Sequence, residues 1–378
     1  MTLIPNSKTA YLEIDQLQCG YDSTPVINGI SFWLERGQIG CLLGPSGCGK
    51  STALRAIAGF LKPFSGSINV NGRCLSDNRK CLPPEKRNLG MVFQDYALFP
   101  HMTVRENLGF GLNRLSVSER ERVCDEYLEL IRMSGYANAY PAELSGGQQQ
   151  RVAVARSLAI KPDILLLDEP FSGLDVARRA QIRTETLRLV KQTGVATLMV
   201  THDPEEAMFM ADRILVMNEG RVVQDGRPTN LYFSPADAFV AELFGPVNRF
   251  QTKVQNGMAE TPLGRFDAAH LADGADATVL IRPEAIRLGA ANTDPHAMPG
   301  DAPCAPAKPL PPGEKTPPPV RLEVITARPL GRSTFVMLRL DGGATLEARV
   351  PGVFLPDSGD AVSVAVNANQ AHVFAATS

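Results

Sequence analysis

The stretch that decides the fold is GQIGCLLGPSGCGKSTALRAIAGF, residues 37–60. Its apolar run over residues 39–43 predicts a buried strand, and the residues from Lys50 onward predict a helix that follows a glycine-rich turn. Gly44, Gly49, Lys50 and Ser51 match the pattern G-x4-G-K-[ST], which is typical of loops that hold nucleotide phosphates. An ordinary strand-to-helix turn is the alternative, and a strand and a helix in the required places make it the weaker one.

The turn predicts chemistry as well as shape. Glycines let backbone N–H groups face phosphate oxygens, and the N-terminus of the helix adds partial positive charge. We expect Lys50 to reach the β- and γ-phosphates and Ser51 to hold Mg²⁺. The predicted phosphate loop consists of Gly44, Pro45, Ser46, Gly47, Cys48, Gly49, Lys50, Ser51 and Thr52.

Other apolar strands end in polar side chains. The run LGMVF is followed by Gln94, DILLL by Asp168 and Glu169, and VATLMV by Thr201 and His202. Ligands of open α/β sheets bind at the carboxyl ends of the strands. We therefore expect these side chains to gather beside the phosphate loop.

These residue types suit nucleotide hydrolysis. Asp168 is placed to hold Mg²⁺, and Glu169 can accept a proton from an attacking water as general base. Gln94 can orient that water or complete the Mg²⁺ shell, and His202 can donate a hydrogen bond to the γ-phosphate. A single histidine at a strand end is more often structural, but the company of the other strand ends favours a functional His202.

Patterning along the chain predicts two domains. Residues 1–244 alternate strand and helix signals, with a helical insert at about 100–160 that opens on capping-box patterns from Thr103 to Glu106 and from Ser116 to Glu119. Residues 245–378 hold short β-branched runs typical of a small all-β domain. Within them, ten of the 29 prolines fall in an insertion at about 293–320. That composition predicts an extended loop, with a proline-motif docking site as the alternative.

Bulk composition excludes some classes. The 378 residues carry a net charge of −2, which gives no support for a polyanion-binding protein. No apolar run approaches the ~18 residues of a membrane span, and the first residues lack the pattern of a secretion signal. The seven cysteines form no CxxC pair, as expected for free thiols in a reducing cytosol.

The motifs together resemble those of the ATP-binding subunits of ABC transporters. GPSGCGKST resembles the Walker A motif, Gln94 the Q-loop, LSGGQ at 144–148 the signature motif and ILLLDEP at 164–170 the Walker B motif. SGLD at 172–175 resembles the D-loop and His202 the switch histidine. The resemblance also implies that Tyr21 stacks on the adenine of ATP, whereas a simple packed tyrosine is the alternative.

The resemblance implies ATP and Mg²⁺ as cofactors and two subunits closed head to tail around two ATPs. The signature residues Ser145, Gly146, Gly147 and Gln148 then cover the γ-phosphate bound by the partner copy. The residues alone support an anion site at a helix N-terminus, and without the resemblance a helix cap is the simpler interpretation.

Residues 245–378 resemble the regulatory domain of importer ATPases, most clearly in LIRPEAIRL at 280–288, which implies a small barrel of the oligonucleotide-binding type. Nothing there favours nucleic acid. The resemblance implies a peripheral protein on the cytoplasmic face of the inner membrane, partnered by a permease and indirectly by a solute-binding protein. Ferric ion is the favoured solute, and a polyamine or another small solute is the alternative. Tyr96, Leu98 and Phe99 suit a socket for a permease helix, with local packing as the alternative.

Two other functions fit the sequence less well. A soluble ABC ATPase acting on nucleic acid or the ribosome usually carries long coiled coils or paired ATPase domains, and this chain has one such domain and no sustained heptads. A non-catalytic protein on the same fold would have degraded motifs, yet Lys50, Asp168, Glu169 and His202 are all present.

Overall fold

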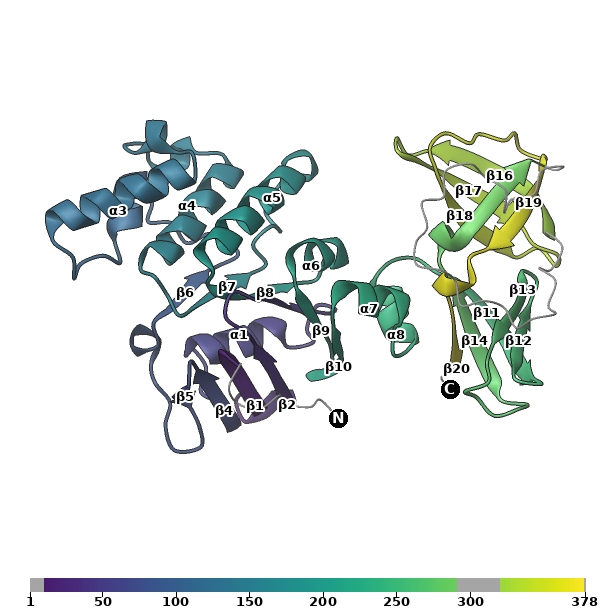
Figure 1. Ribbon diagram of the computed structural model, residues 1–378, viewed down its shortest axis with the longest axis horizontal. Coiled ribbons are helices and arrows are strands. Elements are labelled where there is room, and N and C mark those ends of the chain that lie inside the picture. Colours follow the sequence, from purple (N-terminus) through teal and green to yellow (C-terminus); the bar gives the residue numbers. More distant parts are fainter. Residues whose placement is uncertain (1–9, 291–319, 377–378) are drawn as a thin grey trace. The chain divides into compact units, whose positions relative to one another are not determined.

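The computed structural model describes residues 10–290 and 320–376 (Figure 1). The chain divides into two compact units, Met1–Leu231 and Tyr232–Ser378. The sequence-based boundary after residue 244 lies beyond α8 (Ala238–Leu243) and stays a prediction. The predicted proline-rich insertion, at about 293–320, lies outside the described residues, apart from the Val320 that opens β16.

A six-stranded sheet forms the centre of the first unit, in the order β10-β9-β3-β8-β7-β6. Neighbours from β9 to β6 are parallel, and β10 is antiparallel to β9. Every residue of β3, β7 and β8 is buried, which explains their unbroken apolar runs. The strands are β3 (Ile39–Leu43), β6 (Leu89–Val92), β7 (Ile164–Asp168), β8 (Ala196–Thr201), β9 (Arg213–Asn218) and β10 (Arg221–Gly226).

A second, antiparallel sheet covers the first helix, α1 (Lys50–Ala58), in the order β2-β1-β4-β5. In the ribbon, α1 lies between this sheet and the central sheet (Figure 1), and one hydrophobic core joins apolar side chains of all three. The helix that follows the phosphate loop is therefore held on both sides. The strands are β1 (Leu12–Tyr21), β2 (Thr24–Leu34), β4 (Ser65–Val70) and β5 (Arg73–Ser76).

The helical insert contains α2 (Val104–Gly109), α3 (Val117–Leu130) and α4 (Gly146–Ala159). Both predicted capping boxes are confirmed, with Thr103 and Glu106 at the start of α2 and Ser116 and Glu119 at the start of α3. The chain then returns through β7 to α5 (Val176–Thr193) and through β8 to α6 (Pro204–Met210), before α7 (Pro228–Phe233). Short 3-10 turns lie at Pro84–Lys86, Ser134–Tyr136 and Pro141–Glu143.

Among its described residues, the second unit is all-β apart from the end of α7, the helix α8 and two short 3-10 turns, Pro283–Ala285 and Ala368–Gln370. Its two five-stranded sheets, β13-β12-β11-β14-β20 and β15-β19-β16-β17-β18, share one hydrophobic core. The predicted fold class, an α/β P-loop domain with a helical insert followed by a small all-β domain, is confirmed. The strands are β11 (Asn248–Gln255), β12 (Met258–Thr261), β13 (Gly264–Asp267), β14 (Asp276–Ile281), β15 (Ile286–Ala290), β16 (Val320–Pro329), β17 (Ser333–Arg339), β18 (Thr345–Pro351), β19 (Ala361–Val366) and β20 (Ala371–Ala375).

Within the part of the chain that the structure describes, no helix combines the length and the apolarity that a membrane crossing requires.

Candidate nucleotide site

The phosphate loop joins β3 to α1, and its last glycine begins the helix without a side-chain cap. Gly49 has a φ of 104°, and a Cβ at this position would lie 2.5 Å from Cδ1 of Ile27. Only glycine fits, because the backbone is left-handed and the space is occupied. The first N–H groups of α1 therefore keep no side-chain acceptor of their own, which suits a phosphate.

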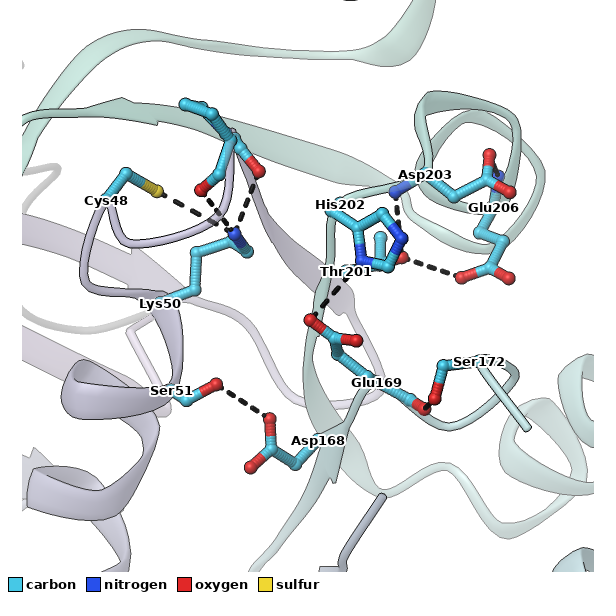
Figure 2. A network of polar contacts seen from close by, with 12 residues as sticks. Cys48, Lys50, Ser51, Asp168, Glu169, Ser172, Thr201, His202, Asp203 and Glu206 are labelled. Atoms are coloured by element: carbon cyan, nitrogen blue, oxygen red, sulfur yellow. Dashed lines mark hydrogen bonds and ion pairs between the residues drawn. The ribbon is translucent and has the colours of Figure 1, made fainter. Parts of the chain in front are cut away.

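The side chain of Lys50 lies inside the loop, with 5% of its surface exposed. Its Nζ donates to the carbonyl oxygens of Gly44 at 2.8 Å and Pro45 at 2.9 Å, and it lies 3.8 Å from Sγ of Cys48 (Figure 2). The loop thus holds an ammonium charge beside its own N–H groups. This end of β3 is prepared for an anion.

Asp168 ends β7 opposite the start of α1. The Ser51 hydroxyl donates to Oδ1 of Asp168 at 3.0 Å (Figure 2). Burial raises the pKa of the Asp168 carboxyl, against the opposing effects of the Ser51 hydrogen bond and the nearby charge of Arg55. A cation beside Asp168 would relieve this burial cost.

The oxygen donors fit Mg²⁺, which binds one or two carboxylates and takes its remaining ligands from phosphates and water. Among residues 10–290 and 320–376, no cluster of three or more His, Cys, Asp or Glu side chains forms a metal site.

Glu169 and His202 face each other from the ends of β7 and β8. Nδ1 of His202 lies 3.3 Å from Oε1 of Glu169, and the side chains are 53% and 21% exposed respectively (Figure 2). The backbone of Glu169 is left-handed, with a φ of 43°, which is costly for a residue other than glycine. Its N–H donates to the Val200 carbonyl at 3.0 Å, and the Ser172 hydroxyl donates to its carbonyl at 3.0 Å. These bonds hold the Glu169 backbone in place at the sheet edge.

The two remaining residues near the phosphate loop are exposed. Gln94 follows β6 by two residues, and β6 is the parallel neighbour of β7, so its backbone lies at the same sheet edge as Asp168. Tyr21 ends β1 with 44% of its surface exposed, and its hydroxyl accepts a hydrogen bond from Nη1 of Arg55 in α1 at 3.3 Å. Its ring is free to receive a planar group.

The signature segment, residues 144–148, begins α4. Ser145 and Gln148 form a capping box, in which the Ser145 N–H donates to Oε1 of Gln148 at 2.8 Å and the Gln148 N–H donates to Oγ of Ser145 at 3.4 Å. The helix cap expected from the residues alone is confirmed. A Cβ on Gly147 would lie 2.3 Å from Cδ1 of Ile182, so this glycine lets α4 approach α5 closely. No polar contact among the described residues joins this segment to the phosphate loop.

The predicted docking segment, residues 95–104, packs partly inward. Tyr96 is buried, its hydroxyl faces Gly173, and its carbonyl accepts a hydrogen bond from Nη2 of Arg156 at 3.2 Å. For Tyr96 the structure supports the alternative of local packing. The ring of Phe99 lies 4.3 Å from that of Phe110, and Phe110 is 47% exposed. Sequence reasoning missed Phe110, because its contact with Phe99 crosses from a loop to the end of a helix.

Sequence reasoning named Thr201 as a strand end but missed Asp203, Glu206 and the bonds that join the three residues. Thr201, Asp203 and Glu206 are joined by hydrogen bonds at the junction of β8 and α6. The available signal was the spacing D-x-x-E from Asp203 to Glu206 at the start of a helix.

Comparisons with known proteins identify the family of this chain. Residues 27–172 match the family described as ABC transporter, and residues 279–374 match the TOBE domain. The Fe(3+) ions import ATP-binding protein FbpC 2 of Rhizobium meliloti is 47% identical over 264 residues, which cover 68% of this chain and slightly less than two thirds, 65%, of that protein. The spermidine/putrescine import ATP-binding protein PotA of Ruegeria pomeroyi is 43% identical over 306 residues, which cover 78% of this chain and 82% of that protein.

A solved structure is also similar to part of this chain. The structure of cbiO1 from Clostridium perfringens, described as part of the ABC transporter complex cbiONQ, has a TM-score of 0.55 and 31% identity. The match covers 59% of this chain and 91% of that chain.

Fold and site define a P-loop ATP-binding protein with its phosphate loop at the carboxyl edge of a mostly parallel sheet. The chain belongs to the family of ATP-binding proteins of ABC transporters. It is an ATPase of that family and carries a C-terminal TOBE domain.

Proposed function

We propose that this chain hydrolyses ATP at the edge formed by the ends of β3, β7 and β8, and that hydrolysis drives solute import through a membrane permease. The observation that carries the proposal is the pair of Glu169 and His202, whose Oε1 and Nδ1 atoms lie 3.3 Å apart. The pair lies at the carboxyl edge of the sheet, where the phosphate loop follows β3. The Glu169 carboxylate offers a proton acceptor and the His202 imidazole offers a hydrogen-bond donor at the same place.

In the proposed reaction, Glu169 accepts a proton from the attacking water. His202 donates a hydrogen bond to the γ-phosphate, and Gln94 orients the water. The Lys50 ammonium and the N–H groups of the phosphate loop stabilise the negative charge on the transferred phosphoryl group. Tyr21 stacks on the adenine with its exposed ring.

Ser51, Gln94 and Asp168 are the residues that we propose for Mg²⁺. Bound there with ATP, the ion would neutralise charge on the phosphate oxygens. The Ser51 hydroxyl, which donates to Asp168 at 3.0 Å, would turn its lone pairs to the ion, and Asp168 would be held charged despite its burial.

We propose further that the working form is a head-to-tail homodimer, in which Ser145, Gly146, Gly147 and Gln148 complete the site of the partner copy. Support comes from the chemistry of the signature segment, a glycine-rich helix N-terminus that makes no hydrogen bond to the phosphate loop of its own chain among the described residues. The permease would dock near Phe99 and the exposed Phe110 that contacts it.

Ferric ion is the solute that we propose, supported by the 47% identity to a protein named for Fe(3+) import. A polyamine is the second candidate, because relatives named for spermidine/putrescine import match at 40–43% over a larger share of the chain. Deleting the gene and measuring uptake of radiolabelled ferric ion and of spermidine separates the two. A loss of spermidine uptake with intact iron uptake would reject the ferric proposal.

The variant Glu169→Gln tests the catalytic proposal, since it keeps the shape of the side chain and removes the proton acceptor. We expect kcat to fall by about 10³-fold while ATP still binds. Phosphate release and equilibrium binding of a fluorescent ATP analogue give the two measurements. Glu205→Gln, on the exposed side of α6, is the matched control. Near-wild-type turnover of Glu169→Gln would remove Glu169 from the proposed role.

A further inference from the structure

Two buried polar side chains lie directly behind His202. Thr201, the last residue of β8, is 1% exposed, and Glu206 in α6 is 3% exposed. The Thr201 hydroxyl donates to Oε2 of Glu206 at 2.7 Å, and it accepts a hydrogen bond from the Asp203 N–H at 3.1 Å (Figure 2). One hydroxyl thus fixes the backbone on both sides of His202.

The order of these bonds is set by the chemistry of the hydroxyl. The Thr201 hydroxyl has one hydrogen to donate and two lone pairs, and the Glu206 carboxyl accepts the hydrogen bond that it donates. A lone pair of Thr201 is then available to the Asp203 N–H. If Glu206 did not accept the proton, the hydroxyl could rotate and the contact to Asp203 would lose its fixed partner.

Asp203 continues the chain of contacts. Its Oδ1 accepts from the N–H groups of Glu205 at 2.8 Å and Glu206 at 3.2 Å, at the start of α6. Its Oδ2 lies 3.6 Å from Nη1 of Arg179, and Nη2 of Arg179 donates to the Leu174 carbonyl at 3.1 Å. The segment around His202 is therefore tied to β8, to α6 and to the turn that follows Glu169.

The imidazole itself is held weakly. Its side chain is 53% exposed, and its polar contact among the described residues is the one with Glu169 at 3.3 Å. A half-exposed ring cannot be oriented by packing alone, so the backbone on either side must set its direction.

Glu206 would be hard to explain as a core residue. Its neighbours on the buried side of α6, Ala207 and Met210, are apolar. Burial raises the pKa of the Glu206 carboxyl; the nearby Asp203 charge adds to this effect and Arg179 and Arg183 oppose it. A carboxyl in such a position costs stability unless a hydrogen bond compensates, so its presence indicates a role.

A simple capping box does not describe the arrangement. In that motif the acidic side chain accepts from the N–H of the N-cap residue, which here is Asp203. Instead, the Asp203 N–H is bound by Thr201, and Glu206 binds Thr201. The acidic side chain acts one step away, through the residue that precedes His202.

We infer that Glu206 is a positioning residue for ATP hydrolysis: through the Thr201 hydroxyl it fixes the backbone on both sides of His202 and so aims the imidazole at the γ-phosphate. This inference rests on the proposed role of His202.

The first test removes the hydroxyl. We expect Thr201→Val to lower kcat by about 10- to 100-fold with ATP affinity unchanged, because a misdirected imidazole affects the reacting geometry and leaves the phosphate loop intact. Thr201→Ser, which keeps the hydroxyl, should restore the rate. Thr197→Val is the matched control, since Thr197 is an equally buried threonine of the same strand. An equal loss of rate in Thr197→Val would overturn the inference.

The second test uses Glu206. Glu206→Ala should lower kcat as Thr201→Val does, and Glu206→Gln should retain the rate, because its amide oxygen can accept the same proton. Glu205→Ala on the exposed side of α6 is the control. A Glu206→Gln variant as slow as Glu206→Ala would overturn the inference, since it would show that the acceptor is not what matters.

A double-mutant cycle separates positioning from general support of the fold. In a His202→Ala background, Thr201→Val should cause no further loss of rate, because the group that it positions is gone. Glu206→Ala gives the same cycle if Thr201→Val does not fold. If Thr201→Val lowers kcat in the His202→Ala background by the same factor as in the wild type, the positioning role alone is overturned. A wild-type rate in His202→Ala itself would instead remove His202 from the proposed function.

Discussion

The chain contains two glycine-rich turns that each begin a helix, and they are built differently. The phosphate loop opens α1 with Gly49 at its N-cap and no side-chain cap. The signature segment opens α4 with Ser145 at its N-cap, and Ser145 and Gln148 satisfy each other's N–H groups. One helix N-terminus is left open for a ligand in its own chain, whereas the other is closed until something displaces its cap.

Charge separates the two turns as well. The phosphate loop holds the Lys50 ammonium against its own carbonyls and ties Ser51 to Asp168. The capping box of the signature segment contains only serine and glutamine. A fully charged phosphate therefore has a counter-charge at the first turn and only N–H groups and a hydroxyl at the second. This favours primary binding at the phosphate loop and a completing role for the signature segment.

Lys50→Ala should have the largest effect, because it removes the counter-charge. We expect kcat/KM for ATP to fall by about 10³-fold, with most of the loss in binding. Steady-state hydrolysis and binding of a fluorescent ATP analogue measure the two parts. Lys62→Ala, at an exposed lysine shortly after α1, should behave as wild type. Intact ATP binding in Lys50→Ala would mean that the two turns are not distinguished by charge.

Gly146→Asp should have the second largest effect on hydrolysis, and unlike Lys50→Ala it should leave ATP binding intact. A Cβ on Gly146 would lie 3.6 Å from Cδ2 of Leu174, so the fold has room for the side chain, and an acidic residue in the first turn suits a helix N-terminus. We expect the protein to fold and bind ATP, while the carboxylate repels a γ-phosphate and lowers kcat by about 10²-fold. Gly146→Asn, neutral and of similar size, should lose less.

Mixing the two variants tests where the signature segment acts. In a head-to-tail dimer of one Lys50→Ala chain and one Gly146→Asp chain, one site combines an intact phosphate loop with an intact signature segment. Equal mixing of the two inactive proteins should therefore restore hydrolysis. If both turns serve one site within a chain, the mixture stays inactive.

Ser145→Ala should separate stability from activity. It removes one half of the capping box, and we expect the free energy of unfolding to fall by about 1 kcal/mol. Ser116→Ala removes an equivalent cap from α3 and should cost about the same. Urea denaturation measures both losses. Only Ser145→Ala should also slow hydrolysis; equal rates in the two variants would leave the signature segment with a structural role alone.

Much of this fold was predictable because its signals are local. The apolar runs of β3, β7 and β8 and the capping boxes at Thr103 and Ser116 depend on residues close in sequence, and all of them were found. The placement of Asp168, Glu169 and His202 followed from one rule about strand ends in parallel sheets.

The remainder depends on contacts between distant residues. Tyr96 is buried because Gly173 and Arg156, far along the chain, form its surroundings. The Lys50 ammonium lies against the loop carbonyls, a geometry that the motif does not specify. The pairing of Thr201 with Glu206 was missed because the spacing D-x-x-E predicts a hydrogen bond from the Asp203 N–H to the Glu206 side chain. In the structure the Thr201 hydroxyl lies between the two and makes a hydrogen bond with each.

The smallest effect that we predict concerns pH, and it comes from Asp168, which lies beside the phosphate loop. Burial raises the pKa of Asp168 above its ordinary value of 3.8, so the folded chain binds this proton more tightly than the unfolded chain. Stability contributed by Asp168 is therefore lost as pH rises from about 4 through the raised pKa. Asp168→Asn, which can still accept from Ser51, should be more stable than wild type at pH 7, and the gap should narrow as pH falls toward 4. Urea denaturation without nucleotide measures this difference in the free energy of unfolding.

Gln148→Glu, which brings a titratable group into the capping box, should show the opposite trend, because a carboxylate at a helix N-terminus has a lowered pKa and stabilises when charged. If the difference in the free energy of unfolding between Asp168→Asn and wild type does not change with pH, burial does not raise the pKa of the Asp168 carboxyl. The contrast in charge between the phosphate loop and the signature segment would then depend on Lys50 alone.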